Sequence, residues 1–270
     1  MVPPPRDFTS AQFKFGWVID GLPPDDELTR IVQGGLHGTA MLPWRVPDVA
    51  LDAILQHVKT FDREAWTATA LGTRVELSAD PWGDAREEEA ITRGQIVYHG
   101  VAQCYACHPA YISRGELSAA RGGAGDIRAD LHESAILRSD HRRGGEPLMI
   151  RAPDFTWDAL RSVREASTRE DLYRVIAAGI PGTAMPTWQG ALASADLWAL
   201  AWYVESLTRL RDRPEGQLLR ERLRRADPSA SAAGEPGGSR TPPAASAGDL
   251  DPSAPVTPPP APSATSLPAR

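Results

Sequence analysis

Two thiols and an imidazole stand close together near the middle of the chain. Cys104 and Cys107 are separated by two residues, and His108 follows directly. This spacing is the attachment signal for c-type haem, because two thiols held so close together can both add to vinyl groups on one porphyrin edge. The adjacent histidine can then approach the iron. The pattern predicts one covalently bound haem c, held through these three residues.

Three other interpretations of the same residues stay open at this point. A disulfide redox pair belongs in a thioredoxin-like strand–helix–strand context, whereas the flanks here have helical patterns. A zinc site needs four ligands. Because the chain has only two cysteines, zinc would have to recruit His132 and His141 from a glycine-rich stretch. Buried structural cysteines would not require His108.

A methionine in a suitable loop strengthens the haem interpretation. A haem iron bound by histidine on one face often takes a methionine sulfur on the other, which raises the reduction potential. Such a methionine must lie on a loop that can wrap around the ring. The chain has four methionines, and Met185 stands among glycines and prolines between two helical patterns. We expect Met185 to be the second axial ligand and Met149 to be a packing residue.

An internal repeat places another methionine in the same setting. Residues 28–41 and 172–185 align at a constant offset of 144, and both end in Gly-Thr-Ala-Met. An Asp-Phe-Thr triplet precedes each copy, and a tryptophan follows each methionine by three residues. Each copy then continues into a pattern with the i, i+3, i+4, i+7 spacing of a buried helix face. Met41 is therefore the counterpart of Met185.

The two copies are unequal. The second follows a helical pattern over Glu87–Val101 and the cysteine–histidine motif, and the first follows neither. We expect a partial unit over residues 1–61, a linker over 62–85 and a complete unit over 86–212. Residues 213–270 would hold a short arginine-rich helix and an Ala/Pro/Ser-rich tail from Asp227. The tail has too few apolar residues to offset its ordering entropy, so we expect it to be disordered.

The cysteine–histidine motif, the methionine loop and the apolar helix around Leu197–Leu207 together resemble class I cytochrome c domains. The order of these features along the chain matches that family, and the resemblance covers residues 3–61 and 86–209. It implies an all-α fold, with a cytochrome c-like helical domain preceded by a partial second copy. It also implies His108 and Met185 as axial ligands and a role in electron transfer. In this family haem is attached outside the cytoplasm, so a periplasmic or otherwise extracytoplasmic location is expected.

The start of the chain departs from that family. The first residues have neither the basic start nor the apolar stretch of a secretory signal peptide. Together with the missing first haem motif, this favours an N-terminally truncated form of a longer di-haem cytochrome. One haem c is then expected in the chain as given and two in a full-length form, where Met41 would ligate the second iron.

Charge and hydropathy exclude several classes of function. The net charge is −6 and the basic residues are scattered, which argues against nucleic-acid binding. The longest apolar run, Leu197–Val204, is far too short to cross a hydrocarbon layer of roughly 30 Å. Two cysteines cannot build a disulfide-stapled scaffold.

The resulting functional hypothesis is a one-electron carrier. An iron with histidine and methionine ligands has no open position, so we expect no enzymatic activity of the chain itself and transient contacts with redox partner proteins. The alternative is a cytochrome subunit or module of an oxidase or dehydrogenase complex. A haem-based gas sensor is disfavoured because it needs an open iron position.

The remaining histidines are assigned to structural positions. We expect the backbone around Pro153 to accept the Nδ1–H of His108, since such bonds commonly fix the tautomer of a ligating histidine. We expect His132 and His141 to be exposed to solvent. We expect His37, His57 and His99 to lie at the surface or to be half-buried.

Overall fold

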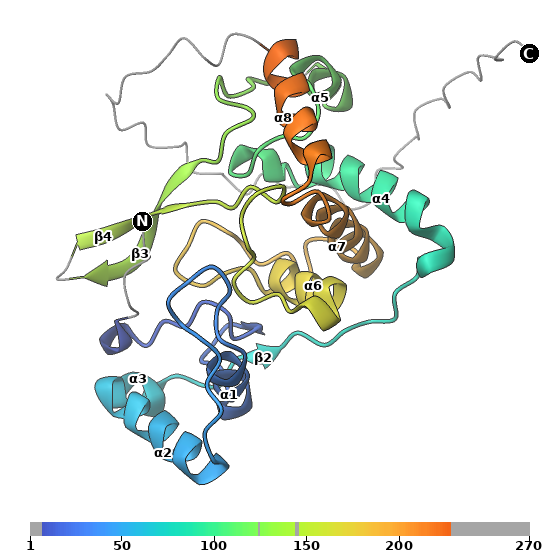
Figure 1. Ribbon diagram of the computed structural model, residues 1–270. Helices are drawn as coiled ribbons and strands as arrows, with labels where there is room; N and C mark the ends of the chain where they lie inside the picture. The colour runs from blue at the N-terminus through green and yellow to red at the C-terminus, as the bar shows by residue number, and fades with distance from the viewer. Residues whose placement is uncertain (1–6, 124, 144–145, 228–270) are drawn as a thin grey trace, which may run out of the picture. The chain divides into compact units, whose positions relative to one another are not determined.

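Helices dominate the fold, as the sequence predicts. The structure is a computed structural model that describes residues 7–123, 125–143 and 146–227, without the side chains of 140–147 (Figure 1). The helices are α1 (Asp25–Gly34), α2 (Asp48–Lys59), α3 (Arg63–Ala68), α4 (Glu87–Ile96), α5 (Arg114–Ala120), α6 (Thr168–Ala178), α7 (Ser194–Thr208) and α8 (Pro214–Ala226). Two antiparallel strand pairs complete it, β1 (Val18–Ile19) with β2 (Thr73–Arg74) and β3 (Ile136–Arg143) with β4 (Glu146–Arg151). The predicted all-α class is confirmed.

The core of the second unit forms where α4, α6 and α7 pack together (Figure 1). Helix α7 is buried from Leu197 to Val204, as expected for a helix that is apolar on all sides. At the crossing with α4, a Cβ atom on Gly94 would lie 2.0 Å from the carbonyl oxygen of Ala199. Only glycine allows the two backbones to approach this closely.

The segment before α4 packs on the same core. The indole of Trp198 donates to Ser78 Oγ at 3.0 Å, and the indole of Trp202 donates to Asp80 Oδ2 at 3.0 Å. Trp82 donates in return to a backbone carbonyl at the start of α7. Part of the predicted linker is thus fixed to the second unit, and the boundaries at residues 61 and 86 stay a prediction.

The first unit has a much smaller core. Helices α1 and α2 bury Leu28, Leu51 and Leu55, as their apolar spacing indicates. No counterpart of α4 precedes α1 within the described residues. Many large apolar side chains of this unit are exposed to solvent: Leu42, Trp44, Val49, Ile54 and Phe61.

Two details differ from what the sequence predicts. The stretch after the haem motif contains the β3–β4 hairpin, for which the first subsection gives no prediction, and Met149 on β4 is exposed rather than packed. A Gly-Gly pair between two short strand-like runs is a hairpin signal that would have predicted it. The arginine-rich helix begins at Pro214, where proline is tolerated in the first turn. Of the tail predicted from Asp227, residues 228–270 lie outside the described residues.

Candidate functional site

The cysteine–histidine motif forms one tight turn. Gln103 adopts a left-handed conformation with φ +49°, and a 3₁₀ turn follows over Cys104–Ala106. The amide of His108 donates to the carbonyl of Cys104 at 3.0 Å. Residues three apart in a 3₁₀ turn eclipse each other, so Cys104 and Cys107 share one side of the turn. The backbone therefore gathers both thiols and the imidazole.

Neither cysteine forms a disulfide bond. Burial raises the pKa of Cys104 to about 12, and burial also raises the pKa of Cys107. Thiol–disulfide exchange and zinc binding both require the thiolate, which these environments disfavour. Among the described residues, no group of three or more His, Cys, Asp or Glu side chains is arranged to hold a metal ion. The disulfide and zinc alternatives therefore gain no support.

The ring of His108 is held in a defined orientation. Its Nδ1 lies 2.9 Å from the carbonyl oxygen of Pro153, which confirms the predicted acceptor. Because a carbonyl can only accept, Nδ1 carries the proton and Nε2 keeps its lone pair. The ring also stacks on Phe155, with centroids 4.7 Å apart. Burial lowers the pKa of His108 and so favours the neutral form that binds metals.

The segment that directly follows Pro153 is fixed by a buried tyrosine. The amide of Phe155 donates to the Tyr111 hydroxyl at 2.8 Å, and this hydroxyl donates to Asp154 Oδ1 at 3.1 Å. The same carboxylate oxygen accepts the amide of Thr156 at 2.9 Å. Tyr111 was not singled out by the sequence analysis, and no local signal identifies it.

A second group missed by the sequence analysis is Arg128. Its guanidinium donates to the carbonyls of His108 at 3.1 Å and Leu131 at 3.2 Å, and also to that of Glu133. Its Nε is buried and has no hydrogen-bond partner within the described part of the chain. Burial lowers the pKa of this guanidinium. An unpaired cationic N–H beside the attachment turn fits an anionic group such as a haem propionate.

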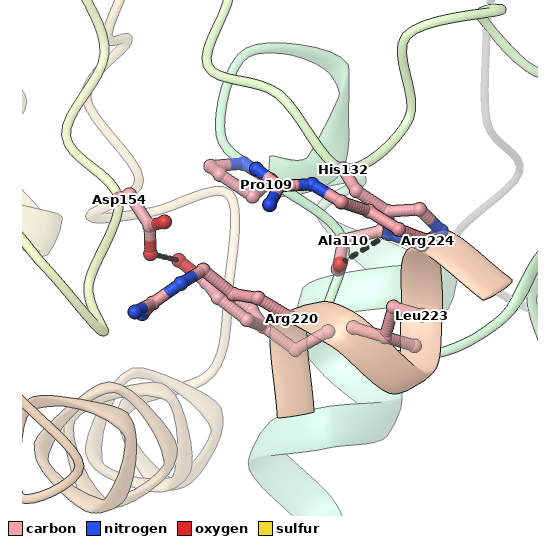
Figure 2. Close-up of a pocket in the computed structure, with 8 residues that line it drawn as sticks. Pro109, Ala110, His132, Asp154, Arg220, Leu223 and Arg224 are labelled. Atoms are coloured by element: carbon pink, nitrogen blue, oxygen red, sulfur yellow. Dashed lines mark hydrogen bonds between the residues drawn. The ribbon is translucent and has the colours of Figure 1, made fainter. Parts of the chain in front are cut away.

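Beyond Asp154 lies a small pocket with both polar and apolar lining, which Figure 2 shows between the attachment segment and α8. His132 borders it, and the prediction that this residue is exposed is wrong, since its side chain is only 6% exposed. Its Nδ1 lies 2.9 Å from the carbonyl oxygen of Ala110 and its Nε2 lies 2.8 Å from Oδ2 of Asp227. Asp227 also accepts the amide of Arg114, so this residue is fixed and does not belong to the tail.

The remaining histidines give mixed outcomes. His37 and His57 are exposed, as predicted. His99 is fully buried, against prediction, because the helix α4 continues into a π-helical turn over Val97–Val101 that rotates this side chain inwards. Burial lowers the pKa of His99 to about 4. The side chain of His141 lies outside the described residues.

The methionine loop is closed by its own hydrogen bonds. The amide of Ile180 donates to the carbonyl of Met185 at 3.1 Å, and the hydroxyl of Thr183 donates to the carbonyl of Ile180 at 2.7 Å. The amide of Met185 donates to the same hydroxyl at 3.1 Å. Gly179, at φ +68°, starts the loop, and a Cβ there would lie 2.5 Å from a loop carbonyl. Ser139 on β3 ties the loop to the hairpin.

The fold brings the attachment turn and the methionine loop to one core. Cys104 and Met185 both pack against the large hydrophobic cluster of the second unit. His108 reaches this cluster through Phe155, which belongs to it. The haem-binding roles of Cys104, Cys107, His108 and Met185 remain predictions, and these contacts support them.

No known family model matches the sequence, and no curated protein matches it. Within the described residues, no helix is long and apolar enough to span a membrane. Among solved structures, the fold is similar to a chain of the reducing HAO-like protein complex of Kuenenia stuttgartiensis, with a TM-score of 0.59 and 25% sequence identity. The match covers 77% of this chain and 83% of that chain.

The match to this solved chain extends beyond the second unit. Of the 270 residues, 77% is about 208, which is more than residues 86–212 contain, so the similarity extends outside the second unit. The chain therefore has a helical, cytochrome c-like fold, and it shares this fold with a component of a protein complex.

Proposed function

We propose that this chain is an electron-transfer protein that carries one haem c on its second unit. Cys104 and Cys107 would form the thioethers, and His108 and Met185 would be the axial ligands. The observation that carries the proposal is the Nδ1–H bond from His108 to Pro153 at 2.9 Å. Within the described residues Nε2 of this ring makes no hydrogen bond, so its lone pair remains for a metal. When bound, haem supplies a one-electron iron couple.

The protein residues set the properties of such a site. A hydrogen bond from Nδ1–H to a carbonyl makes the histidine a better donor and prevents the ring from rotating. A methionine sulfur favours the reduced iron and so raises the potential. The bonds from Thr183 hold the methionine loop closed and keep Met185 in position. Together these residues favour electron transfer over ligand binding or catalysis at the metal.

The second candidate is a cytochrome subunit of an oxidase or dehydrogenase complex. One observation favours it, namely that the similar solved chain is a component of a reducing protein complex. In both roles the chain passes electrons to partner proteins, has no catalytic residue of its own and works outside the cytoplasm, where haem c is attached.

Haem retention tests the proposal. The chain is produced in a periplasmic c-type maturation system and then extracted with acidified acetone. We expect one haem per chain to remain with the protein. Cys104→Ala or Cys107→Ala should weaken retention and the double variant should abolish it, whereas Met149→Leu, at an exposed site, should retain the full amount. Complete loss of colour from the unmodified protein would reject the covalent site.

A further inference from the structure

A larger pocket adjoins the small one between the attachment segment and α8. Both pockets are lined by His132 and Asp154. Three arginines complete much of the larger wall, Arg151 from β4 and Arg220 and Arg224 from α8. We call this space the arginine pocket. Its volume is about 270 Å³, whereas a single water needs only about 10–15 Å³. The arginine pocket is therefore large enough to hold a small ligand.

One of these arginines, Arg220, is fixed by one end of its guanidinium. Its Nη1 donates to the carbonyl of the buried Thr156 at 3.2 Å and to Thr156 Oγ1 at 2.8 Å. Its Cζ lies 5.3 Å from the ring centre of the exposed Trp157, which also lines the pocket. Figure 2 shows this side chain reaching from α8 toward Asp154. Within the described residues its Nε and Nη2 make no hydrogen bond, so a positioned cation keeps open donors.

The other two arginines are only loosely paired. Arg224 lies one turn after Arg220, on the same face of α8. Its Nη2 lies 3.4 Å from Oε1 of Glu133, and both side chains are more than half exposed. The Nη2 of Arg151, which is also more than half exposed, lies 3.3 Å and 3.4 Å from the two carboxylate oxygens of Asp158. Ion pairs this long and this exposed contribute little, so an added anion can compete for both guanidiniums.

A carboxylate in the same wall determines which anion fits. Oδ1 of Asp154 already accepts three donors, the amide and hydroxyl of Thr156 and the hydroxyl of Tyr111. Its Oδ2 makes no hydrogen bond within the described part of the chain. This oxygen repels an anion that has no proton, whereas an anion with an O–H group can donate to it. The ring of His132 adds no open donor, because one nitrogen faces a carbonyl oxygen and the other faces Asp227.

We propose that the arginine pocket is a binding site for inorganic phosphate. The three guanidiniums contact the unprotonated oxygens of the anion, and its P–O–H group donates to Oδ2 of Asp154. Inorganic phosphate keeps at least one such proton throughout the neutral pH range. Sulfate has none, and a phosphate monoester loses its last proton with a pKa of about 6. The pocket consists of protein side chains alone, so this proposal does not depend on the haem.

Calorimetric titration of the intact, matured chain tests the proposal. The probes are inorganic phosphate, sulfate and glycerol 3-phosphate, each added in a buffer free of other oxoanions at about pH 7.5, where the monoester has lost its proton. We expect saturable binding of one inorganic phosphate per chain. Sulfate and glycerol 3-phosphate should bind at least about tenfold more weakly, because neither can donate to Asp154.

Two neighbouring arginines of α8 supply a matched pair of variants. Arg224→Gln removes one guanidinium of the pocket at an exposed position, so the fold should persist and phosphate affinity should fall at least about tenfold. Arg225→Gln removes the same charge from the next residue, which does not line the pocket and pairs with Glu221. This control should leave the phosphate affinity nearly unchanged. Equal losses in the two variants would show a general effect of charge and contradict a site.

A third variant tests the role of the phosphate proton. Asp154→Asn keeps Oδ1 as the acceptor of its three donors and replaces Oδ2 with an N–H group. We expect sulfate to bind this variant at least as tightly as phosphate does, the reverse of the unmodified chain. Circular dichroism verifies that the variant is folded, and the selectivity of the unmodified chain tests the proposal even where it is not. Absence of saturable phosphate binding, or equal affinity of the unmodified chain for phosphate and sulfate, would overturn the proposal.

Discussion

Replacing Tyr111 by phenylalanine removes one hydroxyl that makes two buried hydrogen bonds. The hydroxyl accepts the amide of Phe155 at 2.8 Å and donates to Asp154 at 3.1 Å. The buried Phe155 amide would lose its partner, which costs about 1–3 kcal/mol, and the bond to a charged acceptor contributes a similar amount. We expect Tyr111→Phe to lower the free energy of unfolding by about 2–4 kcal/mol in urea titrations.

Tyr105→Phe is the matched control. Tyr105 is also buried, but its hydroxyl makes one long bond of 3.4 Å to the side chain of Gln103. Its removal should cost well under 1 kcal/mol, since a bond of that length contributes little. Equal destabilisation by the two variants would refute the role given to Tyr111.

A readout at the histidine separates positioning from general stability. Tyr111 fixes the segment whose Pro153 carbonyl accepts from His108. We therefore expect faster solvent exchange of the His108 Nδ1 proton in Tyr111→Phe than in Tyr105→Phe, measured by NMR under conditions where both are folded. Equal exchange rates would show that the tyrosine does not position the ring.

Three further predictions follow from the packing, the loop and the buried histidine. Gly94→Ala should cost about 1–3 kcal/mol in the urea titration, because its Cβ would meet a backbone oxygen at 2.0 Å, whereas Gly115→Ala, with open space around it, should be tolerated. Met185→Ala should lower the reduction potential and let carbon monoxide bind, and Met149→Ala should change neither. The folded-state pKa of His99 is about 4, below its ordinary 6.5. As the pH falls, this residue is therefore protonated in the unfolded chain before it is protonated in the folded chain. Stability should therefore fall by roughly 3 kcal/mol between pH 6.5 and 4, and His99→Gln should remove most of this slope in pH-dependent unfolding.

Sequence reasoning succeeded where short-range patterns determine the structure. The repeat, the glycine-started loops of Met41 and Met185 and the burial of Leu51 and Leu55 all follow from spacing along the chain. Such patterns determine the local backbone geometry and the buried face of a helix. Both can be predicted with little knowledge of the tertiary fold.

Sequence reasoning failed where distant residues meet. His132 pairs with Asp227, which is 95 residues away, and no local pattern predicts that contact. His99 is buried because a π-helical turn shifts the register, and a period of 3.6 residues assigns it to the wrong face. The role of Tyr111 depends on a segment more than forty residues later in the chain.

The most direct measurement of the central claim is the mass of one tryptic peptide. Cleavage after Arg93 and Arg114 releases residues 94–114, which contain both cysteines and His108. For protein matured in a c-type system, we expect this peptide to carry the mass of one haem and to resist alkylation at both thiols. A peptide of unmodified mass whose two cysteines are both alkylated would contradict the claim that this chain carries haem c.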